Sequence, residues 1–179
     1  MNQLAMSERS NQQTVSSMSM PSLDLFSIRS ATNQDADHIQ TLVFSVLAEY
    51  GFTPDPSGTD ADLTDIEAAY FNLGGMFEIA EAEDGTLVGT IGLFPLDHST
   101  CELRKMYLLP QVRGLGLGKL LLTRAIERAR AAGFKRIVLE TASVLTTAAK
   151  LYTSFGFVPM TPDHLSPRCD QAYALDLTE

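Results

Sequence analysis

The stretch QVRGLGLGKLLLTRAIERA, residues 111–129, places three glycines and a lysine directly before an apolar helical pattern. Glycine lets a backbone adopt left-handed conformations and press close to a ligand, and a helix N-terminus attracts anions. A mobile turn explains one glycine, but not three at alternate positions before an amphipathic helix. The stretch therefore predicts a phosphate-binding loop, and its spacing discriminates between three kinds of phosphate ligand.

A nucleoside triphosphate is the first kind, and it requires the pattern G-x-x-x-x-G-K-[ST]. Here only three residues separate Gly114 from Gly118, so the glycines are too close together. Leu120 also occupies the position at which a hydroxyl would bind the metal of a triphosphate. The triphosphate interpretation fails on both counts.

A dinucleotide is the second kind, and it requires G-x-G-x-x-G/A after a strand, with an acidic residue about twenty positions later. Gly114, Gly116 and Glu140 fit this pattern, but Lys119 occupies the third glycine position. A long side chain there conflicts with close helix–strand packing, so a dinucleotide-binding protein is kept only as an alternative. The third kind is a pyrophosphate held by consecutive backbone N–H groups, without a metal.

The periodicity of apolar residues predicts an α+β fold with a mixed sheet. Alternation of apolar and polar residues indicates strands, and spacings of three and four indicate helices. The expected strands cover residues 26–28, 76–82, 86–96, 101–109, 136–141, 157–160 and 171–177. The first expected helix carries apolar residues from Ile39 to Tyr50 on one face, and a short acidic helix follows within 51–75. Two further helices are expected over 117–132 and 145–156. Thr32 and Asp35 resemble a capping box before the first helix.

Charge and composition exclude several classes of protein. A net charge of -9 and a pI near 4.7 argue against nucleic-acid binding, which needs a basic face. Cys101 and Cys169 are too few for a disulfide framework and match no zinc spacing, so we expect no metal, a reducing compartment and a cytoplasmic location. No apolar run approaches the ~20 residues of a membrane span. Residues 1–24 lack the apolar middle of a signal peptide and predict a disordered tail before one domain over 25–179.

The motif Arg113-x-x-Gly116-x-Gly118, with MYLLP before it and LYTSFGF after it, resembles the Gcn5-related N-acetyltransferase (GNAT) family. That family has the loop [Q/R]-x-x-G-x-[G/A] and often a late helix with A-x-x-L-Y-x-x-x-G-F. The resemblance covers residues 26–177. It implies a GNAT-like fold, a central and mostly antiparallel sheet that splays between its fourth and fifth strands and is flanked by helices.

The resemblance also implies acetyl-CoA as the co-substrate, entering between ELRKMYLL and RIVLET. The backbone around Met106, Tyr107 and Leu108 would pair with the pantetheine arm, as an added strand would. The pyrophosphate would meet the amides of the glycine loop, with the helix dipole assisting. The cofactor-binding residues expected in that loop are Arg113, Gly114, Leu115, Gly116, Leu117, Gly118 and Lys119. The side chains of Arg113 and Lys119 are candidates to add positive charge.

Three residues are candidates for the chemistry of acetyl transfer. Tyr152 in KLYTSFGF matches the tyrosine of the family, and a phenol with a pKa of about 10 can protonate a thiolate. On spacing alone, Tyr152 also fits an ordinary packing residue. A carboxylate must receive the proton of the attacking ammonium, and Glu140, twelve residues before Tyr152, is slightly preferred over Glu102. Ion pairs of Glu140 with Arg136, or of Glu102 with Arg104, are the structural alternatives.

One departure from the family pattern affects the pantetheine contact. Many relatives carry an asparagine seven residues before the tyrosine, where this sequence has Leu145. Ser143, Thr146 or Thr147 are the candidates to replace it, or the contact is absent. The departure weakens the likeness to the peptide-acetylating subgroup and leaves coenzyme binding unaffected.

The expected reaction is direct attack of a primary amine, in a small molecule or a peptide, on acetyl-CoA. The segment after the first helix holds acidic residues and no basic one, which suggests a cationic acceptor or an ordinary solvated acidic surface: Asp55, Asp60, Asp62, Asp65 and Glu67. HLSPRCDQAY is a candidate substrate loop. A silent acyl-CoA-binding regulatory module is the alternative to an enzyme. No nucleic acid or membrane partner is expected, and a homodimer is left open.

Overall fold

The structure is a computed structural model that describes residues 25–162 and 164–177. The tail predicted over 1–24 lies outside these residues. The strands are β1 (Phe26–Ser30), β2 (Met76–Ala82), β3 (Leu87–Pro95), β4 (Thr100–Leu108), β5 (Arg136–Thr141), β6 (Val158–Met160) and β7 (Gln171–Asp176). The α-helices are α1 (Ala36–Glu49), α2 (Ile66–Ala69), α3 (Leu117–Ala131) and α4 (Thr146–Ser154). Their order along the chain confirms the predicted α+β arrangement.

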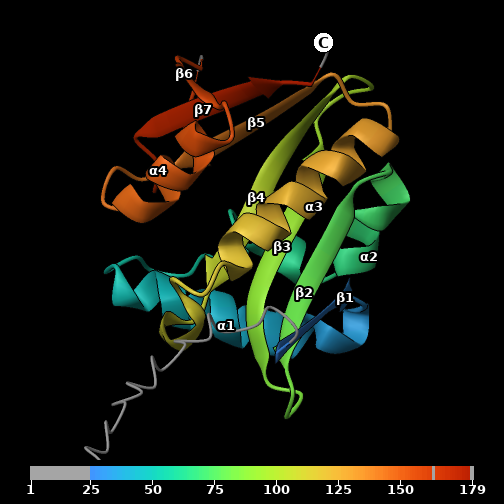
Figure 1. Cartoon of the computed structure of the whole chain (residues 1–179), viewed down its shortest axis with the longest axis vertical. Helices are drawn as coiled ribbons and strands as arrows, with labels where there is room; N and C mark the ends of the chain where they lie inside the picture. The colour runs from blue at the N-terminus through green and yellow to red at the C-terminus, as the bar shows by residue number, and fades with distance from the viewer. Residues whose placement is uncertain (1–24, 163, 178–179) are drawn as a thin grey trace, which may run out of the picture.

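All seven strands form one mixed sheet in the order β1-β2-β3-β4-β5-β7-β6. Every neighbouring pair is antiparallel except β4 and β5, which run parallel. These two strands pair only where residues 100–102 face residues 136–138, and beyond that point they diverge (Figure 1). The splay predicted between the fourth and fifth strands is confirmed, and it leaves the rest of β4 without a strand beside it on that edge.

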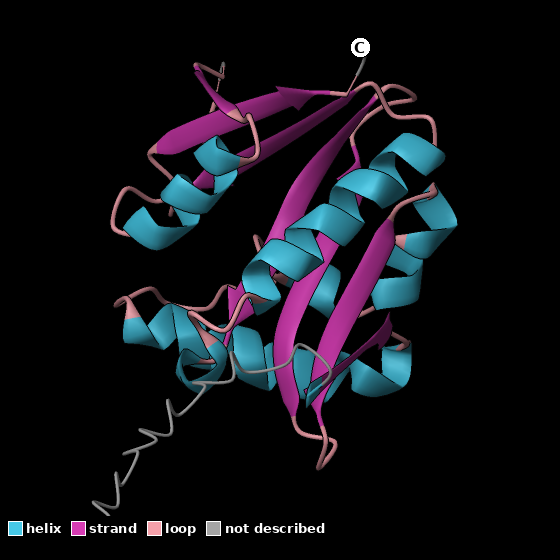
Figure 2. Cartoon of the chain, in the orientation of Figure 1, coloured by secondary structure: helices cyan, strands magenta, loops and turns pink. Residues whose placement is uncertain are grey.

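Helices cover both faces of the sheet (Figure 2). Leu121, Leu122 and Ala125 of α3 are fully buried in one hydrophobic cluster, together with residues of β3, β5 and β7. On the other face, Ile39 and Val43 of α1 are fully buried in a second cluster. Each fully buried leucine or isoleucine contributes about 2 kcal/mol to folding. The two clusters hold α1 and α3 rigidly against the strands between them.

The start of α1 is secured by the capping box predicted from the sequence. Thr32 and Asp35 exchange the backbone and side-chain bonds of that motif, and the Thr32 amide donates to Asp35 Oδ2 at 2.8 Å. Arg29 Nη2 donates to the same carboxylate at 2.7 Å. The hydrogen bonds from Arg29 lower the pKa of Asp35 from 3.8 to about 2.

We expect Asp35→Asn to lower the free energy of unfolding at pH 7 by about 1 kcal/mol, after allowing for the partial exposure of Arg29. Because the folded pKa of Asp35 is depressed, its stabilisation is fully present above pH 3.8 and is lost as the pH falls toward about 2. Urea unfolding of both proteins between pH 7 and pH 3 measures this. A difference that stays constant across this range would contradict the assignment.

A β-bulge interrupts β4 opposite the middle of β3. Thr90 pairs with Tyr107, yet Gly92 pairs with Arg104, so β4 contains one additional residue. Lys105 takes a left-handed conformation there, with φ 52, and its carbonyl accepts a hydrogen bond from Thr90 Oγ1 at 2.6 Å. Bulges of this kind re-aim the groups that follow them. The residues re-aimed here are Met106 and Tyr107.

Candidate functional site

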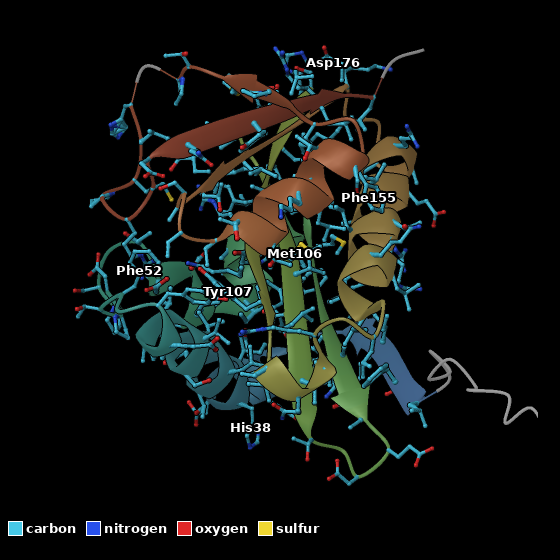
Figure 3. The ribbon with its side chains drawn as sticks, turned by 60° about the vertical axis from the view of Figure 1, so that its left-hand side comes forward. His38, Phe52, Met106, Tyr107, Phe155 and Asp176 are labelled. Atoms are coloured by element: carbon cyan, nitrogen blue, oxygen red, sulfur yellow. The ribbon has the colours of Figure 1, made fainter. Side chains whose placement is uncertain are left out.

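A cleft of about 850 Å³ lies where β4 and β5 separate. Its walls come from the end of α1, the loop after it, β4, the glycine loop, α4 and the segment before β7. Figure 3 labels Met106 and Tyr107 on β4 near the centre of the view and Phe52, which also lines the cleft, to their left. Most of the predicted site residues line the cleft: Glu102, Met106, Tyr107, Leu108, Arg113, Gly114, Gly116, Gly118, Lys119, Glu140 and Tyr152.

The glycine loop presents its backbone to this cleft. Gly114 and Gly116 have φ values of 76 and 89, which favour glycine over any other residue. Gly116 is the N-cap of α3 and makes no side-chain cap hydrogen bond. Among the described residues, none of the amides of residues 114–119 donates a hydrogen bond to another backbone group or to a side chain. The start of α3 therefore has donors and a positive dipole end available for an anion.

Gly118 has a different role from the other two glycines. A Cβ on Gly118 would lie 3.2 Å from a methyl carbon of Leu108 and 3.6 Å from one of Leu151. The missing side chain lets the first turn of α3 pack closely against β4 and α4. The loop thus combines two conformational glycines with one that permits close packing.

The side chains of three predicted loop residues are engaged within the protein, which leaves the backbone amides of Leu115 and Leu117 as their possible contribution to the cleft. Leu117 is fully buried and Leu115 packs against the α3 cluster, so neither side chain lines the cleft. The Arg113 guanidinium is engaged within the protein, donating from Nε to the Leu108 carbonyl at 3.0 Å and from Nη2 to Glu49 at 2.9 Å. Arg113 therefore anchors the loop to β4 and α1, and its charge is already paired.

Tyr152 lies on α4 and faces the cleft from a buried position. Its side chain is 6% exposed, and its hydroxyl donates to Met106 Sδ at 3.8 Å. Burial, assisted by nearby Tyr107, raises the pKa of the Tyr152 phenol above its ordinary value, so the phenol keeps its proton at neutral pH. A thioether is a weak acceptor, so the hydroxyl is free to exchange this partner for a stronger one.

The two candidate bases differ in their partners. Glu140 Oε2 accepts hydrogen bonds from Ser166, at 2.9 Å from its amide and 2.5 Å from its hydroxyl, and not from Arg136. Glu102 Oε2 is paired with Arg104, at 2.6 Å from Nε. Within residues 25–162 and 164–177, no hydrogen bond reaches Oε1 of Glu140. Oε1 of Glu102 likewise accepts no hydrogen bond in the described part of the chain. The two carboxylates differ in the charge of their partner: Glu140 is held by the neutral Ser166, whereas a proton on Glu102 would weaken its ion pair with Arg104.

Asp60 and Asp62 are not part of an open anionic surface, whereas Asp55, Asp65 and Glu67 of the same segment are exposed. Asp60 is 1% exposed and receives two hydrogen bonds of 2.8 Å from Arg168 and one of 2.7 Å from Lys105. Burial alone would raise the pKa of Asp60, but these hydrogen bonds outweigh it and hold the pKa well below its ordinary value. Asp62 also lies close to Lys105, 3.2 Å from its Nζ. Both carboxylates are matched by cations of this chain.

The segment before β7 completes the cleft. The interpretation of HLSPRCDQAY as a substrate loop agrees with the placement of Arg168 and Cys169 in the cleft wall. Burial, with the nearby charge of Glu140, raises the pKa of the Cys169 thiol to about 11, so it is a poor nucleophile at neutral pH. Cys169 therefore contributes wall surface rather than covalent chemistry.

The start of α4 holds the candidates for the missing asparagine contact. Leu145 lines the cleft, as do Thr146 and Thr147, which are both exposed. Ser143 is occupied, because its hydroxyl donates to Asp170 at 2.6 Å. The two threonines therefore remain as candidates to contact a ligand.

In the described ranges, no helix is both long and apolar enough to cross a bilayer, and no group of His, Cys, Asp or Glu could hold a metal.

Comparisons with known proteins agree with this geometry. Residues 43–157 match the family described as "Acetyltransferase (GNAT) family". The uncharacterized N-acetyltransferase YjgM of Escherichia coli is 43% identical over 135 residues, 73% of this chain and 80% of that protein. A solved GNAT acetyltransferase from Staphylococcus aureus has a TM-score of 0.80 at 26% identity, covering 86% of this chain and 99% of that one. The Salmonella typhimurium protein yncA, solved with its cofactor acetyl-CoA, has a similar fold, with a TM-score of 0.68 at 22% identity over 87% of this chain and 95% of that one.

Proposed function

The chain belongs to the GNAT family of N-acetyltransferases, and on that premise we propose that it moves the acetyl group of acetyl-CoA to a primary amine by direct attack. Residues 25–179 act as one N-acetyltransferase domain in this proposal. The observation that carries it is the glycine loop, where uncapped amides at the start of α3 face the same cleft as the open edge of β4. A diphosphate and an extended polar arm fit these two features together.

Binding of acetyl-CoA would use backbone groups more than side chains. The pyrophosphate meets the amides of residues 114–119, and the pantetheine arm runs along β4 beside Met106 and Tyr107. That edge is open because β4 pairs with β5 only at residues 100–102. The Salmonella protein with a similar fold was solved with acetyl-CoA, which supports acetyl-CoA as the ligand of this cleft.

The chemistry requires a neutral amine, a polarised carbonyl and a proton for the leaving sulfur. The amine nitrogen bonds to the thioester carbon, and the C–S bond breaks with its electron pair on sulfur. A backbone amide beside the bulge of β4, near Tyr107, polarises the carbonyl. Glu140, directly or through water, receives the proton of the amine, and Tyr152 donates its phenolic proton to the thiolate.

Two assays test this proposal with the purified chain. Thermal shift with acetyl-CoA, NAD and ATP side by side is expected to show stabilisation by acetyl-CoA alone. Release of free thiol is then followed with a panel of alkyl monoamines and diamines, amino acids and a short peptide with a free N-terminus, and at least one amine is expected to give turnover. Acetyl-CoA binding without turnover would instead indicate a silent acyl-CoA-binding module, and stabilisation by NAD would indicate the dinucleotide alternative.

A further inference from the structure

One buried carboxylate joins three segments of the cleft wall. Asp60 itself does not line the cleft, and its side chain is fully buried. Its oxygens accept hydrogen bonds from Lys105 Nζ at 2.7 Å, from Arg168 Nη1 and Nη2 at 2.8 Å each, and from the Asp55 amide at 3.0 Å. The Asp60 cluster, made of Asp60, Lys105 and Arg168, thus connects β4, the loop after α1 and the segment before β7.

Each end of the Asp60 cluster has a different position in the site. Lys105 is the left-handed residue of the β4 bulge, and its side chain is 5% exposed. Met106 and Tyr107, which the bulge re-aims, follow it directly. Arg168 belongs to the segment before β7, two residues after Ser166, which holds Glu140. The cluster therefore contacts both the bulge next to the expected thioester position and the segment that holds the candidate base Glu140.

We propose that Asp60 is a positioning residue that couples the acceptor-side walls of the cleft to the β4 bulge. The proposal rests on the acetyl transfer proposed above. Asp60 fixes the bulge through Lys105, so that the Tyr107 region meets the thioester carbonyl at a set distance. It also fixes the segment before β7 through Arg168, so that the binding site for the amine is preorganised. The glycine loop is anchored separately, through Arg113 and Glu49, so the contact with the pyrophosphate does not depend on the Asp60 cluster.

Two substitutions separate the two ends of the cluster. In Asp60→Asn the links from Asp60 to Lys105 and Arg168 both lose their charge, and Lys105 keeps only the more distant Asp62, at 3.2 Å, as an ionic partner. We expect KM for the amine to rise about tenfold and kcat to fall about tenfold. In Arg168→Gln the bulge keeps its Lys105–Asp60 pair, so only KM is expected to rise, with kcat within about twofold of wild type. Steady-state thiol release with the best amine of the panel measures both constants, and calorimetry should show that Arg168→Gln binds acetyl-CoA with unchanged affinity.

Glu78→Gln is the matched control, because Glu78 is 2% exposed and is paired with Arg124 at 2.8 Å outside the cleft. It removes a carboxylate of equal burial and should lower stability without changing KM or kcat. The proposal is overturned if Glu78→Gln alters the kinetics as much as Asp60→Asn, or if Arg168→Gln leaves KM unchanged. Should Asp60→Asn fail to fold, Arg168→Gln is compared with Arg168→Lys instead. The lysine variant keeps the positive charge, so its KM is expected to lie between those of Arg168→Gln and the wild type, and equal KM values for the two variants would overturn the proposal. An inactive wild type would overturn the proposed function as well.

Discussion

Tyr152→Phe is expected to reduce kcat about 100-fold, because it removes the proton donor for the leaving thiolate while keeping the aromatic ring. The only hydrogen bond that the Tyr152 hydroxyl makes among the described residues is to the weak acceptor Met106 Sδ. Loss of this weak hydrogen bond should therefore change the free energy of unfolding of the protein little. Acetyl-CoA affinity should stay within about twofold of wild type, since the pyrophosphate is held by the glycine loop.

Tyr173→Phe is the matched control for this substitution. Tyr173 is similarly buried, at 8% exposed, and its hydroxyl donates to Gln171 on the same strand, away from the cleft. Its kcat should equal that of the wild type. Stopped-flow or steady-state thiol release at saturating acetyl-CoA measures both variants. If Tyr152→Phe keeps more than about a third of the wild-type kcat, Tyr152 is a packing residue and another group protonates the sulfur.

Gly116→Val is expected to weaken acetyl-CoA binding about 100-fold. Gly116 has φ 89 at the N-cap of α3, a conformation that valine adopts only with strain. Relief of that strain turns the neighbouring amides away from the pyrophosphate. Loss of one charge-assisted hydrogen bond, worth about 1.5–3 kcal/mol, accounts for a 100-fold effect of about 2.7 kcal/mol. Isothermal titration calorimetry with acetyl-CoA measures the affinity.

Gly85→Val controls for backbone strain in general. Gly85 has φ 82 in the turn between β2 and β3, and a Cβ there would meet nothing within 4 Å. The variant should lose about 1–2 kcal/mol of stability, as Gly116→Val does, but should bind acetyl-CoA like the wild type. Equal loss of binding in both variants would mean that strain, and not the loop amides, accounts for the result.

Periodicity in the sequence predicted much of the fold because it reports burial directly. The apolar-rich run MFEIAEA forms β2 at its expected bounds, as RIVLET forms β5. The bulge at Lys105 was not predicted, because ELRKMYLL shows no glycine or proline to mark it. A left-handed lysine is stable there through Thr90 and Asp60, which are distant in sequence.

The candidate site was predictable where a local motif marks it, and not where distant side chains pair. The glycine loop, Tyr152 and Glu140 are close in sequence to recognisable patterns, and the structure brings them to one cleft. Asp60 looked like a solvated acidic residue, since its partner Arg168 is 108 residues away. Arg113 was likewise a candidate to add positive charge for the ligand, because its partner Glu49 lies 64 residues earlier in the chain. Single-sequence patterns do not reveal such pairings.

Titration of ¹⁵N-labelled wild-type protein with acetyl-CoA, followed by the backbone amide resonances, tests most directly whether the start of α3 holds the diphosphate. The account predicts that the largest chemical-shift changes belong to the amides of residues 114–119. Pantetheine, which lacks the diphosphate, is expected to leave these resonances unchanged. Saturation by acetyl-CoA with the amides of residues 114–119 unmoved would contradict the account.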